Sequence, residues 1–298
     1  MALSEAKRFG VADLKEVLAT HVVAERIYAM VRRVLDAEGV EHLVLKGPHL
    51  AAVAYEQPWQ RGFNDLDILV KQDQFDQALE ALTAAGFSLR PPPPGRAATI
   101  AAAYDRNLLA PDGSVVEIHR GLSPHELYPV DYDGLFARAR SFSFGRTPAR
   151  GLSPEDLLLH LVIHAAKSQF WLIEQKHLQD IEVLVSSHEL DWPAFMERAD
   201  RAGCRRAAWV MLDASNRLCG AAIPLMVLDE LRPARLVRWW LNRWLARDRF
   251  PMIRHPRLPK WLRKALLVPV LVDRLPTAIR ASSVHGLIRV RDLVGRSG

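Results

Sequence analysis

Two carboxylates interrupt an apolar run in the segment Asp65-Leu66-Asp67-Ile68-Leu69-Val70. The run indicates a buried strand, and alternate side chains of a strand share a face, so Asp65 and Asp67 point the same way. Two like charges that close repel each other, and burying them costs desolvation energy, unless a cation lies between them. Hard carboxylate oxygens suit Mg²⁺ or Mn²⁺, the ions that accompany phosphates. The segment therefore predicts a divalent metal site on a buried strand.

The acidic strand lies within a series of helices and strands that we expect over residues 1–150. Before it, the spacing of apolar residues predicts a helix over 11–37, a strand over 42–45 and a helix from Gly47-Pro48 to Tyr55. After it we expect a helix over 73–85, a strand over 87–89, a polyproline linker over 91–94, and strands over 104–110 and 114–119 around the turn Pro111-Asp112-Gly113. This order predicts an α+β fold in which a small mixed β-sheet is flanked by helices.

The pattern changes to helical after residue 150. Ser153 is a suitable N-cap, and Pro154 suits the first helical position. Apolar residues then recur at helical spacing, with a further helix start at Asp191-Trp192-Pro193. We therefore expect two domains, an α/β domain over 1–150 and an all-helical domain over 151–298.

The composition is that of an ordinary globular protein, with 298 residues, 49% hydrophobic and 25% charged. The two cysteines, Cys204 and Cys219, form no disulfide framework or zinc pattern, which fits a reducing compartment. No secretory signal begins the sequence, and no uncharged apolar run reaches the roughly 18 residues that a transmembrane helix needs. The sequence thus predicts a cytoplasmic protein with no transmembrane segment.

The charge is unevenly placed along the chain. Residues 232–298 hold 16 Lys and Arg against 3 Asp and Glu, whereas residues 1–231 hold 24 against 31. This basic C-terminal region suits nucleic acid, acidic lipid headgroups or an acidic partner protein, and it equally suits a solvated helical surface. The sequence leaves these alternatives open.

Three further features are expected to meet at the acidic strand. Lys46-Gly47 lies at a strand-to-helix junction, where a glycine lets backbone approach a phosphate and helical N–H groups favour anions. Arg61 can pair with a phosphate or orient a carboxylate. Glu117 interrupts another apolar strand, and the predicted hairpin can bring it beside the two aspartates, as a third metal ligand or as the base for an attacking hydroxyl.

At this point the sequence resembles the bacterial nucleotidyltransferase-like proteins of the DNA polymerase β superfamily. The resemblance covers roughly residues 10–185 and rests on Leu45-Lys46-Gly47, Tyr55, Arg61, Asp65-Leu66-Asp67-Ile68-Leu69-Val70, Glu117 and His119. It implies that Asp65, Asp67 and Glu117 are catalytic metal ligands for Mg²⁺ or Mn²⁺. It also implies that Gly47, with Lys46 and Arg61, binds the phosphates of a nucleoside triphosphate, most simply ATP.

Several residues keep a structural alternative beside the functional one. Pro48 has no N–H to offer a phosphate, so the charge of Lys46 is expected to compensate. Lys46 is otherwise a solvated strand-end charge, Arg61 a structural partner of Asp65, and Glu117 an outward residue of the hairpin. His119 is either a base or phosphate contact of the substrate cleft or a structural histidine.

The helical domain supplies its own candidates. His160 and His164 lie one turn apart with Lys167 on nearly the same stripe, and we expect His164, Lys167 and Asp180 to line a substrate cleft. Capping or internal pairing is the alternative for Asp180. Trp239, Trp240, Trp244 and Trp261 alternate with arginines, so they either stack on bases or form a core with a basic outer face.

Three functions follow from these features. The first is a metal-dependent nucleotidyltransferase that moves a nucleoside monophosphate to a hydroxyl or phosphate of a peptide, small molecule, RNA or protein. The second is a catalytically inactive protein of the same fold that binds a nucleotide, peptide or partner, and Pro48 favours it. The third is a binder of nucleic acid or of a membrane surface through the basic C-terminal region.

Overall fold

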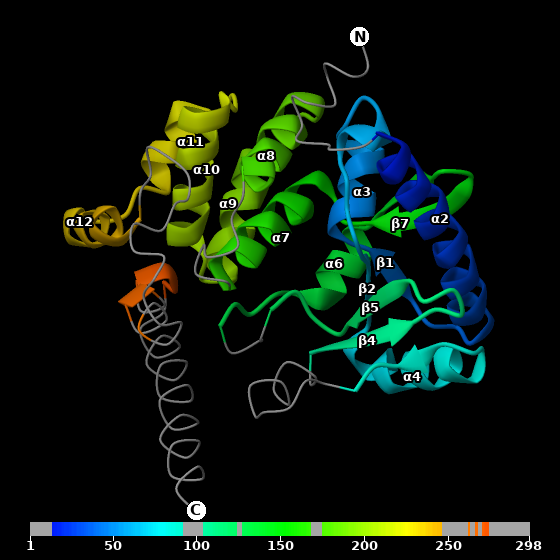
Figure 1. The fold of residues 1–298 in the computed structure, drawn as a ribbon. Coiled ribbons are helices and arrows are strands. Elements are labelled where there is room, and N and C mark those ends of the chain that lie inside the picture. Colours follow the sequence, from blue (N-terminus) through cyan, green and yellow to red (C-terminus); the bar gives the residue numbers. More distant parts are fainter. Residues whose placement is uncertain are drawn as a thin grey trace, which may run out of the picture. The chain divides into compact units, whose positions relative to one another are not determined.

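The computed structural model describes residues 14–91, 104–123, 127–167 and 175–245, together with 262, 266–267 and 270–273. The chain divides into two compact units, one made of residues 1–122 and 131–157 and the other of residues 123–130 and 158–298 (Figure 1). Most of the predicted polyproline linker, with Trp261 and most of the basic C-terminal region, lies outside the described residues.

The described residues of the first unit form a seven-stranded mixed sheet with the strand order β3-β4-β5-β2-β1-β7-β6. The strands are β1 (His42–Val44), β2 (Leu66–Val70), β3 (Ser88–Leu89), β4 (Asp105–Leu109), β5 (Val115–His119), β6 (Arg140–Phe144) and β7 (Thr147–Gly151). Strand β2 is parallel to β5 and antiparallel to β1, and β1 is parallel to β7. A mixed sheet accompanied by helices confirms the predicted α+β class.

The described part of the first unit also contains helices and short 3-10 turns. They are α2 (Leu14–Ala37), α3 (Lys46–Val53), α4 (Phe75–Ala84) and α6 (Tyr132–Arg138), with the short 3-10 turns η1 (Pro58–Gln60) and η2 (Gln72–Gln74). A buried core joins Ile68 and Val116 of the sheet to Val31 of α2 and Phe75 of α4. Because strand side chains alternate, the partners Asp67 and Glu117 lie on the opposite face of the sheet.

The sequence analysis identified neither the β6–β7 hairpin nor α6. The turn of the hairpin holds Gly145 at φ +59, a left-handed conformation that glycine adopts without strain. The Arg150 guanidinium donates to the Phe136 carbonyl at 2.9 Å, which ties the hairpin to α6. Phe142 and Phe144 alternate with serines before Gly145, which was the available sequence signal for this hairpin, whereas Pro148 makes β7 atypical of a strand.

The second unit is helical in its described part. Its helices are the later part of α7 (Pro154–Lys167), then α8 (Gln175–Ser187), α9 (Trp192–Arg201), α10 (Arg205–Cys219), α11 (Leu225–Glu230) and α12 (Arg235–Trp244). The Ser215 hydroxyl donates to the Leu178 carbonyl at 2.7 Å and ties α10 to α8. Asp191 caps α9 by accepting from the Ala194 N–H, as the sequence predicted. None of the described helices is both long and apolar enough to cross a membrane.

The start of α7 is fixed by a buried carboxylate. Asp156 is fully buried and accepts two hydrogen bonds from the Arg138 guanidinium, at 2.9 and 3.2 Å. It also accepts from the Ser153 hydroxyl at 3.0 Å, and Ser153 Oγ accepts in turn from the Asp156 N–H at 3.3 Å. The predicted Ser153 cap is therefore present, and it belongs to a network that joins α7 to α6.

We expect Asp156→Asn to lower the free energy of unfolding by about 2–4 kcal/mol, because it removes the charge that pairs with Arg138 inside the protein. Urea-induced unfolding followed by circular dichroism measures the loss. The matched control is Asp36→Asn, which breaks an exposed i,i+4 pair with Arg32 and should cost less than about 1 kcal/mol. Equal losses for the two variants would contradict a structural role for the buried pair.

Candidate active site

The parallel pairing of β2 with β5 brings the two acidic strands into register. Asp67 lies opposite Glu117, and Leu69 lies opposite His119. Since Glu117 and His119 are two residues apart on one strand, both share a face with Asp67. The register thus brings together two carboxylates and one imidazole. The sequence analysis expected the hairpin to place Glu117 beside the aspartates, and Glu117 does lie beside Asp67.

The donor atoms of these three side chains lie close together. His119 Nε2 is 2.7 Å from Asp67 Oδ1 and 3.5 Å from Glu117 Oε2. One donor atom from each of Asp67, Glu117 and His119 lies within 4.8 Å of the other two. The Asp67 side chain is 1% exposed and that of His119 5%, whereas Glu117 is 24% exposed. Solvent therefore reaches the cluster at Glu117 and is nearly excluded from Asp67.

Lys46 reaches the same cluster from the strand-to-helix turn. Its ammonium donates to Asp67 Oδ1 at 2.9 Å. The Leu45 N–H donates to the Asp67 carbonyl at 2.9 Å, so the chain leaves β1 directly beside that residue. Lys46 has φ +42, a left-handed conformation that costs a non-glycine residue about 1–3 kcal/mol. The backbone is therefore strained at the residue whose ammonium contacts Asp67.

Lys46 and Asp67 each stabilise the charged form of the other. Burial raises the pKa of the Asp67 carboxyl, but the charge of Lys46 and the contact with His119 outweigh burial and hold that pKa well below its ordinary value. Burial lowers the pKa of the Lys46 ammonium, but the charge of Asp67, with smaller contributions from Asp65 and Glu117, raises it above its ordinary value. Asp67 and Lys46 are thus an ion pair.

For Asp65 and Glu117 the charge of Lys46 offsets burial only in part. Burial and then the charge of Asp67 raise the pKa of Asp65, and the same two causes in the same order raise the pKa of Glu117. Three carboxyl groups therefore share the ammonium of Lys46, and the cluster favours additional positive charge. Oxygen donors with surplus negative charge are the chemistry that a divalent cation requires, so these residues fit the predicted ion.

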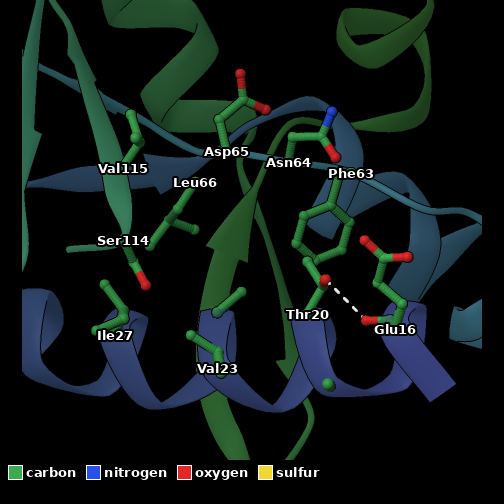
Figure 2. A pocket seen from close by; sticks show the side chains of 12 residues that line it. Glu16, Thr20, Val23, Ile27, Phe63, Asn64, Asp65, Leu66, Ser114 and Val115 are labelled. Atoms are coloured by element: carbon green, nitrogen blue, oxygen red, sulfur yellow. Dashed lines mark hydrogen bonds between the residues drawn. The ribbon is translucent and has the colours of Figure 1, made fainter. Parts of the chain in front are cut away.

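Asp65 lies beside this cluster, at the entry to β2. Its neighbours Phe63, Asn64 and Leu66 line a pocket of 310 Å³ against α2. Figure 2 shows the Asp65 carboxylate pointing away from α2, whereas Leu66 and Phe63 point towards it. Asp65 therefore belongs to the lining of the pocket, with its carboxylate turned away from α2. Its predicted role as a metal ligand stays a prediction.

Gly47 and Arg61 have packing contacts that sequence reasoning did not anticipate. A Cβ atom on Gly47 would lie 2.5 Å from Phe63 Cβ, so a larger residue at 47 would overlap Phe63. Arg61 is 9% exposed, and its guanidinium donates to the Gly62 carbonyl. The Arg61 carbonyl lies 3.1 Å from His21 Nε2 of α2. Both residues hold the loop before β2 in place, and phosphate binding by either one stays a prediction.

Strand β4 adds two polar residues that the sequence analysis did not single out. Asn107 lies opposite Glu117, and Asp105 lies opposite His119. Directly opposed residues of antiparallel strands share a face, so both lie beside the cluster, and both are half-buried. The turn at Pro111-Asp112-Gly113 was the available signal, because it fixes which residues of the hairpin are opposed.

The predicted cleft residues of the helical unit lie on α7 and α8. The His164 ring stacks on His177 at 6.0 Å between centroids and contacts His160 edge-on at 6.4 Å. Asp180 is fully buried. On α12, Trp240 donates to the Leu266 carbonyl at 2.7 Å, whereas Trp239 is 59% exposed. A substrate-binding role for His164, Lys167 and Asp180 stays a prediction.

The chain belongs to the family described as uncharacterised nucleotidyltransferase, whose model matches residues 12–220. This match spans more than half of the chain and confirms the resemblance that the sequence motifs indicated. Among curated proteins, none matches the chain.

Solved structures similar to the chain include the following three proteins. The antibiotic-resistance factor ANT(2'')-Ia is 11% identical, with 61% of this chain and 90% of that chain covered and a TM-score of 0.41. The lincomycin-bound lincosamide adenylyltransferase LnuA is 15% identical, with coverages of 55% and 96% and a TM-score of 0.38. An antigenic nucleotidyltransferase-like protein from Paracoccidioides brasiliensis is 14% identical, with coverages of 57% and 74% and a TM-score of 0.31.

We expect Gly47→Ala to lower the free energy of unfolding by about 1–3 kcal/mol, because the added methyl group overlaps Phe63. The matched control is Gly62→Ala, whose added Cβ would meet Val17 at an ordinary 3.7 Å. The control should change stability by less than about 1 kcal/mol. Urea unfolding of both variants measures the difference, and a Gly47→Ala variant as stable as the control would contradict the packing role.

Proposed function

We propose that the protein is a metal-dependent nucleotidyltransferase. It transfers a nucleoside monophosphate, most simply AMP from ATP, to a hydroxyl or phosphate of an acceptor, with release of pyrophosphate. Membership of a nucleotidyltransferase family supports the general class of reaction. The observation that carries the proposal is the register of β2 and β5, which sets Asp67 opposite Glu117 beside the ammonium of Lys46.

Asp67 and Glu117, with Asp65 at the entry to β2, would hold Mg²⁺ or Mn²⁺. A bound ion of this kind orients a triphosphate, stabilises the leaving pyrophosphate and favours ionisation of an attacking hydroxyl. Glu117 is the more exposed acid of the cluster, and its pKa is raised by burial and by Asp67. It is therefore suited to accept a proton from the acceptor hydroxyl when it is not bound to the ion.

Lys46 would bind the triphosphate. Its ammonium now neutralises Asp67, and a cation at the carboxylates would release it to pair with a phosphate oxygen. Gly47 and Arg61 are the other two residues proposed to bind the phosphates. Gly47 lies at the start of α3, and Arg61 lies in the loop that precedes β2. The helical unit, with His164, Lys167 and Asp180, would supply the acceptor pocket.

A second candidate is a nucleotide-binding protein of the same fold without catalysis. The observations that favour it are the Lys46–Asp67 ion pair, which neutralises Asp67 without a metal, and the packing of Phe63 against Gly47. Calorimetric titration with ATP separates the two candidates. ATP binding that requires Mg²⁺ supports the transferase, whereas ATP binding that is indifferent to Mg²⁺ supports the binder.

We expect Asp67→Asn to reduce nucleotidyl transfer by more than about 100-fold, because it removes the charge of the most buried proposed ligand. The assay incubates the purified protein with each NTP labelled at the α-phosphate, Mg²⁺ or Mn²⁺, and cell lysate, and follows the label into the acceptor. Full activity of Asp67→Asn would overturn the proposed mechanism.

The matched control is Asp73→Asn, the same chemical change at an exposed position of η2. Its activity should equal that of the unmodified protein. Circular dichroism of both variants distinguishes lost chemistry from lost fold, because Asp67→Asn also leaves the Lys46 ammonium without its buried partner.

A further inference from the structure

We infer that His119 binds the metal ion directly, so that an imidazole nitrogen completes the ligand set with the carboxylates of Asp67 and Glu117. The inference rests on the proposed function, since it requires a metal site at Asp67. It goes beyond that function because it predicts which ion the site prefers. A site built from carboxylates alone would give a different preference.

The first argument is the place of His119 Nε2 within the cluster. This atom lies 2.7 Å from Asp67 Oδ1 and 3.5 Å from Glu117 Oε2, and the His119 side chain is buried. Ligands bound at about 2.0–2.2 Å from one ion are separated by roughly 3–4.4 Å. The three donor atoms, within 4.8 Å of one another, therefore need only small shifts to surround an ion.

The second argument is the crowding at one oxygen atom. Asp67 Oδ1 contacts both Lys46 Nζ at 2.9 Å and His119 Nε2 at 2.7 Å. Lys46 supplies a full positive charge to this carboxylate, and His119 adds a second contact to the same oxygen atom. A divalent ion at this point would take over the charge of Lys46. Nε2, which donates to Asp67 Oδ1 in this structure, would bind the ion after its proton has passed to solvent and Nδ1 carries the ring proton.

The third argument is the charge of the ligand set. Asp67 and Glu117 together match the charge of a divalent ion, and a neutral imidazole adds a ligand without adding charge. Imidazole nitrogen suits first-row transition ions, whereas Mg²⁺ prefers oxygen. We therefore expect the site to prefer Mn²⁺ to Mg²⁺ more strongly than its carboxylates alone would.

The test is electron paramagnetic resonance of Mn²⁺ bound to the full-length protein. Electron spin echo modulation detects a nitrogen nucleus bound to Mn²⁺, and labelling only the histidines with ¹⁵N distinguishes imidazole from the Lys46 nitrogen. We expect a histidine nitrogen signal in the unmodified protein, its loss in His119→Gln, and its retention in His188→Gln. His188 is the control because it lies at the end of α8, in contact with Ser187.

Competition between Mn²⁺ and Mg²⁺ gives a second readout. The preference for Mn²⁺, expressed as the ratio of the two dissociation constants, should fall about tenfold or more in His119→Gln and stay unchanged in His188→Gln. Circular dichroism of His119→Gln confirms its fold before the ions are added.

The outcomes separate this inference from the proposed function. Mn²⁺ that binds, depends on Asp67 and shows no histidine nitrogen would overturn the inference and leave the transferase intact, with His119 acting only to position Asp67. A nitrogen signal that persists in His119→Gln would likewise overturn it. Failure of the unmodified protein to bind Mn²⁺ at millimolar concentration, with or without ATP, would overturn both.

Discussion

The buried carboxylate of Asp67 is the constraint on which the site depends. A charge at 1% exposure is stable only where partners replace the water that it has lost. Here the partners come from different elements, Lys46 from the start of α3 and His119 from the end of β5. One charge in the centre of the sheet thus orients the turn after β1 and the strand beside β2, and it does so before any ligand binds.

The turn after β1 illustrates how closely this arrangement is packed. Lys46 is held in a left-handed conformation, and Gly47 follows at a position where Phe63 leaves no room for a side chain. Phe63 in turn contacts the ring of His21 on α2 and that of Phe144 on β6. The direction of the Lys46 side chain is therefore set by the core as well as by the charge of Asp67.

The sequence predicted the elements of the site better than the contacts between them. Strand alternation placed Asp67 on one face, and the turn at Asp112-Gly113 predicted the hairpin that carries Glu117. Alternation also places His119 beside Glu117, yet only the parallel register of β2 with β5 shows that its ring contacts Asp67. Strand pairing between distant segments depends on tertiary packing, which local patterns do not encode.

The same limit explains what was missed elsewhere. Strand β6 alternates Phe142 and Phe144 with serines, but its partner β7 contains Pro148, a residue that is uncommon within strands, so the sequence does not show where β6 pairs. Gly47 was predicted to bind a phosphate. Its close approach to Phe63 was not predicted, because a helix and a loop separate the two residues in the sequence. Arg61 was expected either to pair with a phosphate or to be a structural partner of Asp65, yet its charge gave no indication that the side chain is buried.

The division of the chain into units has a consequence for dissecting the protein. Residues 123–130 belong to the helical unit although the chain returns to the sheet unit at residue 131, so the backbone passes between the units three times. Within that segment Tyr128 is 2% exposed. A fragment that ends at residue 157 would carry Tyr128 without the unit that buries it, and a fragment that begins at 158 would lack it. Neither unit is therefore a contiguous, separately expressible domain, and a single proteolytic cut cannot release one from the other.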